Sequence, residues 1–450
     1  MNRSLLKILG NTALILMLFG YGTYVLNNIV TDTWNEQSIG NSLYSSLSKE
    51  EKNKVGLDNC KCPQLKIRTK EKVESRWLRI CDELLSSKHT NQRMLHFLVG
   101  SENPYWNGSK SVLVPDMKYS KSKLLGDNGI ELQDLKIKMT GGLKDHFDSK
   151  RFSLRVKSHS SVIKSIRSVN FYNPKVRLGG LHEWFVHELL ADAGLAPLRT
   201  GYVNLNINER VGIYFYQEQP TVDMLVDLGY KPGLIVRVLN HVNPETQQNQ
   251  ASLEGLYDEN SLLASLYDKQ IRLLNEKLID YNAGLIKAGE LYSVPKLAQL
   301  AAVIDLTSGY HGLEFRNMYY YFNPQDLLLE PIAREFQVIG YSNADNPSWY
   351  PVPKPGRYRK AAIMEKDDRY LLGQMTLKGE DANSFETHYT TYLTSISRTA
   401  YLDSVFEVLN KELVERQNCL FLANPEFAQF DKQYYYSNQV SIQDHLNGLN

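Results

Sequence analysis

The chain has 450 residues, 42% of them hydrophobic and 22% charged, which indicates a folded protein of one large domain or two smaller ones. Its 51 basic and 50 acidic residues nearly cancel, so no net positive charge is present for nucleic acid binding. The 28 tyrosines favour a sheet-rich structure.

The N-terminus predicts a membrane anchor. Arg3 and Lys7 precede a run without charged residues at positions 8–31, which would span ~36 Å as a helix and cross the ~30 Å hydrocarbon core of a bilayer. Acidic residues follow the run, so the positive-inside rule places the N-terminus in the cytoplasm. We expect a single-pass protein of the cell membrane that contacts the lipid bilayer through residues 8–31 and has its globular part extracytoplasmic. A cleaved signal peptide, which would give a secreted protein, is the alternative.

The four cysteines fit an oxidising compartment. Cys60, Cys62 and Cys81 lie close together in sequence, and Cys419 is distant from them. A single C-x-C pair without a second pair or histidines at metal spacing argues against a zinc site. Disulfides are the expectation, and their connectivity stays open, with Cys81 to Cys60 or Cys62 as one candidate.

The remaining chain divides into three parts. Residues 32–130 form a juxtamembrane and accessory segment with one or two helices at 70–98, residues 131–225 are sheet-rich, and residues 226–450 are mainly helical with a hairpin at 315–336. Within the sheet-rich part, "FSLRVK" alternates, so Arg155 and Lys157 point away from the apolar side of a strand.

Turn and helix-end signals define the later elements. A helix ends at Gly194, and a hairpin over 203–219 turns at Asn208–Arg210. Long helical patterns cover 260–290 and 294–306, the strands 317–322 and 327–332 flank the turn "NPQD", and a last helix runs over about 399–415. A sheet with one helix, then helices, a hairpin and more helix favours an α+β, two-lobed arrangement.

The helix "LHEWFVHELLADAG" carries the first candidate site. His182 and His187 are separated by roughly 140° around a helix, so they cannot form the H-E-x-x-H zinc site. Glu188 falls on the apolar face with Leu181 and Leu189, where a carboxylate needs a cation or donors. Lys157 is the candidate partner, and a glutamate at the helix end that reaches water is the alternative.

The order of these residues matches the parts of a phosphoryl-transfer site. A strand lysine paired with a helix glutamate holds ATP phosphates in kinases. The strand that ends at Glu218 would lie at the adenine edge, and Asn317 and Glu335 offer the oxygen ligands that Mg²⁺ prefers.

Four blocks of the sequence resemble the spore coat protein H (CotH) kinase family, whose members are atypical, secreted or membrane-attached protein kinases. The blocks are "KMTGGLKDHFDSKRFSLRVK", "NFYNPKVRLGGLHEWFVHELLADAGLAPLRTGYVNLNINERVGIYFYQEQ", "IDLTSGYHGLEFRNMYYYFNP" and "LLLEPI". The resemblance implies an atypical protein-kinase-like two-lobed fold after a single N-terminal transmembrane helix. It also implies that Lys157, or Arg155 beside it, contacts the phosphates of ATP, that Glu188 orients the lysine, and that Glu218 lies near adenine.

The resemblance also implies that Asn317 helps to hold Mg²⁺ or Mn²⁺, but two departures affect the catalytic positions. Glu335 stands where similar proteins often have aspartate, and its longer side chain suits octahedral Mg²⁺ poorly. The aspartate expected before the histidine block is missing, so Asp305, His311 or Glu314 would have to act as the base. Two functions follow as alternatives: transfer of the ATP γ-phosphate to hydroxyls of an envelope protein or polysaccharide, or a catalytically degenerate kinase-like scaffold or binding protein of the cell envelope.

Overall fold

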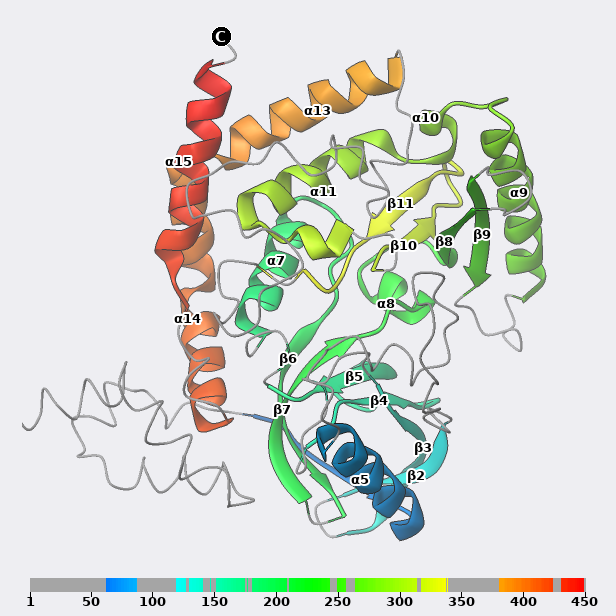
Figure 1. Cartoon of the computed structure of the whole chain (residues 1–450), viewed down its shortest axis with the longest axis vertical. Coiled ribbons are helices and arrows are strands. Elements are labelled where there is room, and N and C mark those ends of the chain that lie inside the picture. The colour runs from blue at the N-terminus through cyan, green and yellow to red at the C-terminus, as the bar shows by residue number, and fades with distance from the viewer. Residues whose placement is uncertain are drawn as a thin grey trace, which may run out of the picture.

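The computed structural model describes residues 62–86, 119–126, 129–140, 146, 151–174, 176, 180–208, 210–242, 249–255, 264–313, 317–336, 338, 380–423 and 430–448. Figure 1 shows a barrel, a second sheet and the helices that pack on them.

Seven strands form a closed barrel in the order β1-β2-β3-β4-β5-β7-β6. Neighbouring strands are antiparallel except β1 and β6, whose parallel pairing of Gln64 with Asn204 through Ile67 with Ile207 closes the barrel. The strands are β1 (Gln64–Thr69), β2 (Ser120–Leu125), β3 (Glu131–Met139), β4 (Leu154–Lys157), β5 (Ser168–Tyr172), β6 (Thr200–Ile207) and β7 (Arg210–Glu218).

Apolar residues at every second position fill the inside of the barrel. Ile137 of β3 and Val156 of β4 are paired in register, and both are fully buried. The helix α5 (Glu71–Ser86) adds Trp77, which is fully buried and meets the ring of Phe152 edge-on at 5.5 Å. Because alternate side chains on a strand point to opposite faces, the polar residues between these positions lie on the outside of the barrel.

The second sheet has four strands in the order β11-β10-β8-β9, and helices pack around it (Figure 1). Its strands are β8 (Leu234–Val242), β9 (Asn249–Gly255), β10 (Tyr319–Phe322) and β11 (Leu329–Ile332). The helical elements outside the barrel are α7 (Leu181–Asp192), α8 (Val222–Asp227), α9 (Ala264–Asn282), α10 (Ala288–Leu291), α11 (Val294–Thr307), the 3₁₀ turn η5 (Tyr310–Leu313), α13 (Glu380–Ile396), α14 (Thr399–Ala423) and α15 (Lys432–Gly448).

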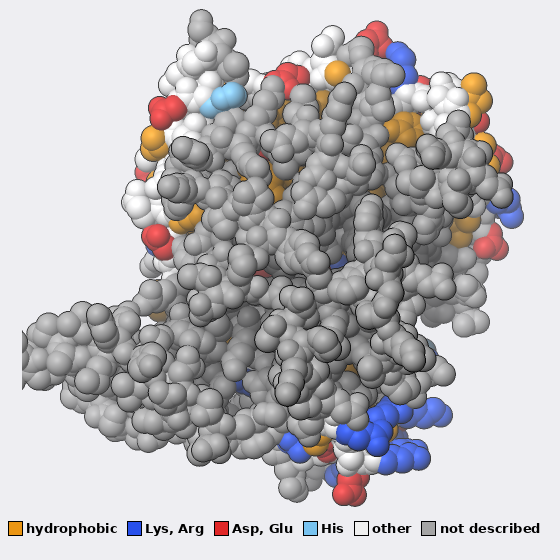
Figure 2. All heavy atoms as spheres, in the orientation of Figure 1, with side chains coloured by type: hydrophobic (Ala, Val, Ile, Leu, Met, Phe, Trp, Pro, Cys, Tyr) orange, Lys and Arg blue, Asp and Glu red, His pale blue; other side chains and the backbone are white. Residues whose placement is uncertain are grey.

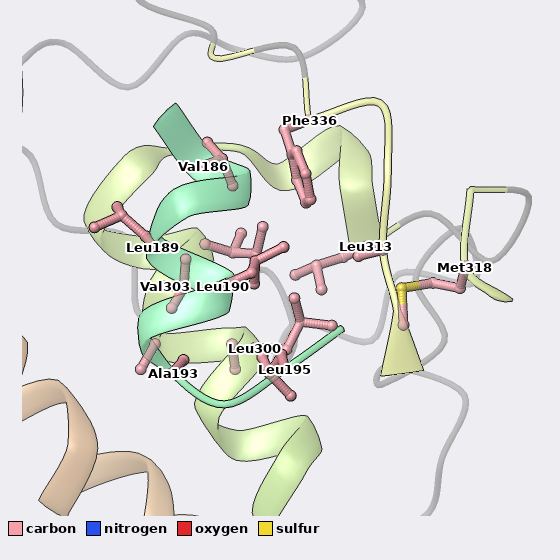
Figure 3. Packing of buried hydrophobic residues seen from close by; sticks show 14 of the residues in the cluster. Val186, Leu189, Leu190, Ala193, Leu195, Leu300, Val303, Leu313, Met318 and Phe336 are labelled. Atoms are coloured by element: carbon pink, nitrogen blue, oxygen red, sulfur yellow. The ribbon is translucent and has the colours of Figure 1, made fainter. Parts of the chain in front are cut away.

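The helix α7 joins the barrel to the rest of the molecule. It starts after Gly180, whose φ of 83° and contact with the Phe215 ring, 2.5 Å from where a Cβ would lie, both require glycine. Figure 3 shows α7 side chains such as Val186 and Leu190 packed against Val303 of α11 and against Phe336, which follows β11. Both faces of α7 are therefore buried.

Most elements predicted from local sequence signals are confirmed. α7 ends near Gly194, which has a φ of 67°, and the hairpin β6–β7 turns at Asn208. The strands β10 and β11 flank the predicted "NPQD" turn, and α9, α11 and α14 occupy the predicted helical segments.

The prediction of an atypical protein-kinase-like two-lobed α+β fold is wrong, because seven strands close into a barrel. β1 and β2 come from the segment 32–130, which the sequence separates from the sheet-rich part, yet they pair with β6 and β3. The alternation that predicts a strand does not reveal its partners, so barrel closure was not visible in the sequence.

The predicted single-pass membrane protein is likewise not supported. The candidate anchor at 8–31 lies outside the described residues, and within the described part of the chain no helix is both long and apolar enough to cross a membrane. Of the cysteines, Cys419 is disulfide-bonded, whereas Cys62 and Cys81 are thiols.

Candidate functional site

Two rows of polar residues cross the outer face of four adjacent barrel strands. Strand register places one residue of each row on β3, β4, β5 and β7. The inner row consists of Lys138, Arg155, Asn170 and Gln217. The outer row consists of Lys136, Lys157, Ser168 and Gln219. Gln219 follows β7 directly, and its backbone N–H donates to the Ser168 carbonyl. Together they form a continuous polar surface that is basic on β3 and β4 and uncharged on β5 and β7.

The basic end is a cluster of three cations, Lys138, Arg155 and Lys157, which we call the basic cluster. The Nζ atoms of Lys138 and Lys157 lie 4.9 and 5.4 Å from the centre of the Tyr119 ring, and the Arg155 guanidinium lies near the Tyr119 hydroxyl. Partial burial and the charge of Arg155 lower the pKa of both lysines. Among the described residues, none of the three cations forms an ion pair with a carboxylate.

Figure 2 shows that Lys and Arg side chains also gather on the surface around β2 and β3. On this side of the barrel Lys123 pairs with Glu131 and Asp134 at 3.2 and 2.7 Å. These two carboxylates pair with Lys123, and no described carboxylate pairs with the basic cluster. Such a group of like charges is stabilised by an anion.

The uncharged end of the surface is buried. Asn170 accepts a hydrogen bond from Arg155 Nε at 2.9 Å and donates one to the Tyr172 hydroxyl at 2.6 Å. Gln217 Nε2 donates to Glu183 at 2.8 Å, while its carbonyl oxygen, on a fully buried side chain, meets no donor among the described residues. A buried carbonyl without a donor costs ~1–3 kcal/mol unless a ligand or water meets it.

Glu183 connects α7 to the segment that follows β11. Its Oε1 accepts from Gln217 Nε2 and from the backbone N–H of Glu335, both at 2.8 Å, and its Oε2 accepts from the N–H of Phe336 at 2.9 Å. The side chain is 2% exposed, and His187 lies 3.8 Å away. These bonds hold Glu335 at a φ of 64°, a left-handed conformation that non-glycine residues rarely adopt.

The structure does not pair Lys157 with Glu188. Lys157 lies beside Arg155 and Lys136 on the barrel, whereas Glu188 lies near Glu412 and Arg416 of α14. Burial, followed by the charge of Glu412, raises the pKa of Glu188. A helical wheel favoured Glu188 as the buried carboxylate, but α7 is covered on both sides, and Glu183 is the more deeply buried of the two.

Glu218, predicted near adenine, is already paired. Both oxygens of its carboxylate accept from the Arg199 guanidinium, at 2.6 Å each, and Arg199 also contacts Asp227 at 3.0 Å. Burial raises the pKa of Glu218, and Arg199 opposes that shift. Bidentate pairing of this kind fixes the end of β7 and leaves Glu218 poorly placed to bind a ligand.

Asp305, predicted to act as a base, lies in the core between α11 and α13. It is 3% exposed and accepts hydrogen bonds from the hydroxyls of Tyr310, at 2.9 Å, and Tyr389. Its oxygens join packed elements and face no open surface. Of the other two candidate bases, His311 is half-buried in η5, and Glu314 lies outside the described residues.

The predicted metal ligands Asn317 and Glu335 each have a partner within the protein. The Asn317 amide donates to the carbonyl of His311 at 2.9 Å, and a Glu335 oxygen lies 3.3 Å from the Arg334 guanidinium, a cation that would repel Mg²⁺ or Mn²⁺. Within the described residues, no group of three or more histidine, cysteine, aspartate or glutamate side chains converges as metal ligands would.

Comparisons with known proteins do not identify the chain: no protein-family model matches it, and no curated protein matches it in sequence. The resemblance to the CotH kinase family therefore stays a prediction.

Several residues of the polar surface were missed from the sequence, although a signal was present. Polar residues flank an apolar one in "KIK" of β3 and in "SVN" of β5, as they do in "RVK" of β4, and the two glutamines of "QEQ" at the end of β7 have the same spacing. Each pair is two residues apart and so shares a face of its strand. Only the strand order shows that the four pairs are neighbours.

Proposed function

We propose that this protein binds a phosphate-bearing small molecule on the outer face of the barrel, with its phosphate groups at the basic cluster. The observation that carries the proposal is the grouping of Lys138, Arg155 and Lys157 around Tyr119 without a carboxylate partner among the described residues. Arginine and lysine are the side chains that most often bind phosphate, through charge-assisted hydrogen bonds.

The ligand extends from the cations toward the uncharged end of the surface. Asn170 already orients Arg155 through a 2.9 Å hydrogen bond, which fixes the guanidinium as a phosphate donor. Gln217 offers a carbonyl acceptor to the rest of the molecule. ATP is the candidate that the CotH resemblance supplies, and binding, which needs no metal ligand from this chain, is the function that the geometry supports best.

Binding is tested by isothermal titration calorimetry with pyrophosphate, ATP and adenosine. We expect pyrophosphate and ATP to bind and adenosine to bind weakly. Arg155→Gln and Lys157→Gln should each weaken the binding of pyrophosphate about tenfold or more, since a hydrogen bond to a charged group contributes ~1.5–3 kcal/mol. Lys269→Gln, which removes an exposed charge from α9, is the matched control. Equal affinities for the site and control variants would refute the proposal.

Phosphoryl transfer is the second candidate, and it rests on the same cluster, which would neutralise the phosphates of ATP. Neither Asp305 nor the pair Asn317 and Glu335 is arranged for the roles that transfer would give them. Incubation with γ-labelled ATP and Mg²⁺ or Mn²⁺ in the presence of protein and polysaccharide acceptors tests it. Incorporation of label that is lost in Lys157→Gln would establish transfer.

A further inference from the structure

A second group of cations lies across the surface from the basic cluster. The guanidinium groups of Arg334 and Arg237 lie 4.9 and 5.4 Å from the centre of the Tyr319 ring. Arg334 is 8% exposed, and its Nη1 donates to Gln219 Oε1 at 3.4 Å. Glu335 lies 3.3 Å from Arg334, so among the described residues this group contains two guanidinium groups and one carboxylate.

Two buried polar atoms next to this group have no partner in the described part of the chain. They are Gln219 Nε2 and Ser168 Oγ, on side chains that are 7% and 8% exposed. The Gln219 carbonyl accepts from Arg334, and its amide nitrogen is a donor that needs an acceptor. Burial without a partner costs ~1–3 kcal/mol per group, which indicates that a ligand completes these bonds.

We propose that Ser168, Gln219 and Arg334 form a second anion subsite, so that the ligand carries two anionic groups and bridges the barrel and the segment after β11. The proposal rests on the proposed binding at the basic cluster. Lys157 is paired in register with Ser168, whose carbonyl accepts from the Gln219 N–H at 2.9 Å. Adjacent strands lie ~4.8 Å apart, so the two anionic groups are separated by roughly 10 Å.

The donors present determine the class of the second group. Gln219 Nε2, the Ser168 hydroxyl and the Arg334 guanidinium can all donate to an anion, and the guanidinium lies over the Tyr319 ring, 4.9 Å from its centre. The second group is therefore a phosphate or a carboxylate, and Arg334 supplies the positive charge there.

The test compares a short and a long anion by calorimetry: pyrophosphate, which fits the basic cluster alone, and linear tetrapolyphosphate, which reaches both subsites. The variant Gln219→Glu keeps the shape of the side chain and gives Arg334 a second carboxylate partner beside Glu335, so its thermal stability should equal or exceed that of the wild type. We expect it to bind tetrapolyphosphate about tenfold more weakly or worse, a loss of about 1.4 kcal/mol, and to bind pyrophosphate as the wild type does.

Two further variants separate the possible outcomes. Gln325→Glu makes the same charge change on the exposed β10–β11 turn and should bind both anions normally. Arg334→Gln should reduce tetrapolyphosphate binding selectively, as Gln219→Glu does. If pyrophosphate binds through Arg155 but Gln219→Glu and Arg334→Gln leave tetrapolyphosphate binding unchanged, the second subsite is refuted and the proposed function stands. If the wild type binds neither anion, the proposed function fails and the subsite with it.

Discussion

Replacing Glu183 by glutamine tests whether its carboxylate holds the barrel side of the molecule to the segment after β11. The wild-type carboxylate accepts three hydrogen bonds, from Gln217, Glu335 and Phe336. In Glu183→Gln the new amide nitrogen replaces one acceptor, and the two remaining bonds change from charged to neutral, which roughly halves their strength. With ~1–3 kcal/mol for the lost bond, and some compensation because a buried charge is removed, we expect the free energy of unfolding to fall by about 3 kcal/mol.

The measurement is urea unfolding followed by circular dichroism, together with hydrogen exchange of the Glu335 and Phe336 amides. Since folded domains have a free energy of unfolding of about 5–15 kcal/mol, the variant should remain folded and the loss should be measurable. The amide hydrogens of Glu335 and Phe336 should exchange faster, because Glu183 is their acceptor. Glu188→Gln, on the same helix, is the control for the amide exchange, which it should leave unchanged because the two N–H groups bond to Glu183. A loss under about 1 kcal/mol, or unchanged exchange at both amides, would refute the reasoning.

Three other changes have expected outcomes. Burial raises the pKa of Glu188, which destabilises the folded state once the carboxyl ionises; Glu188→Gln should therefore be more stable than the wild type at pH 7, and urea unfolding should show the difference disappear as the pH falls to ~4. Burial lowers the pKa of His182 to about 3, so the stability that its neutral form contributes is present above pH ~6.5. Below that pH the free energy of unfolding falls by ~1.4 kcal/mol per pH unit. Between pH 6.5 and 5 the wild type should therefore lose about 2 kcal/mol more than His182→Phe in the same urea assay. Asp305→Ala leaves the hydroxyls of Tyr310 and Tyr389 without their acceptor and should cost about 2–4 kcal/mol in thermal or urea unfolding, whereas a variant as stable as the wild type would show that the buried hydrogen bonds contribute little.

The sequence predicted elements better than it predicted their assembly. Alternation placed Arg155 and Lys157 on the outward face of β4, and the turn at Asn208 joined β6 to β7. Closure of the barrel depends on the pairing of β1 with β6, between residues about 140 positions apart in the chain, and local periodicity contains no information about that contact. The kinase-like fold was inferred from the order of elements, which a barrel can share.

Local periodicity likewise predicted only the part of the candidate site that lies on a single strand. Arg155 and Lys157 do lie together, because they share a face of one strand. The pairing of Lys157 with Glu188 required knowledge of which face of α7 meets the barrel, and a helix buried on both sides gives no amphipathic signal to decide it. The carboxylate of α7 that accepts hydrogen bonds from the backbone of the segment after β11 is Glu183, not Glu188.

The position of the polar surface follows from the closure of the barrel. A barrel of about eight strands is filled by its own side chains, and here pairs such as Ile137 and Val156 occupy the interior, which leaves the outer face for the proposed ligand. On the outside, α7 packs on the apolar part of β5 and β7, and the next outward-facing residues of these strands are Asn170 and Gln217. Glu183 stands at that boundary, because one oxygen binds both Gln217 and the backbone that carries Arg334. Loosening Glu183 should therefore weaken tetrapolyphosphate binding more than pyrophosphate binding, since only the longer anion needs both sides held in register.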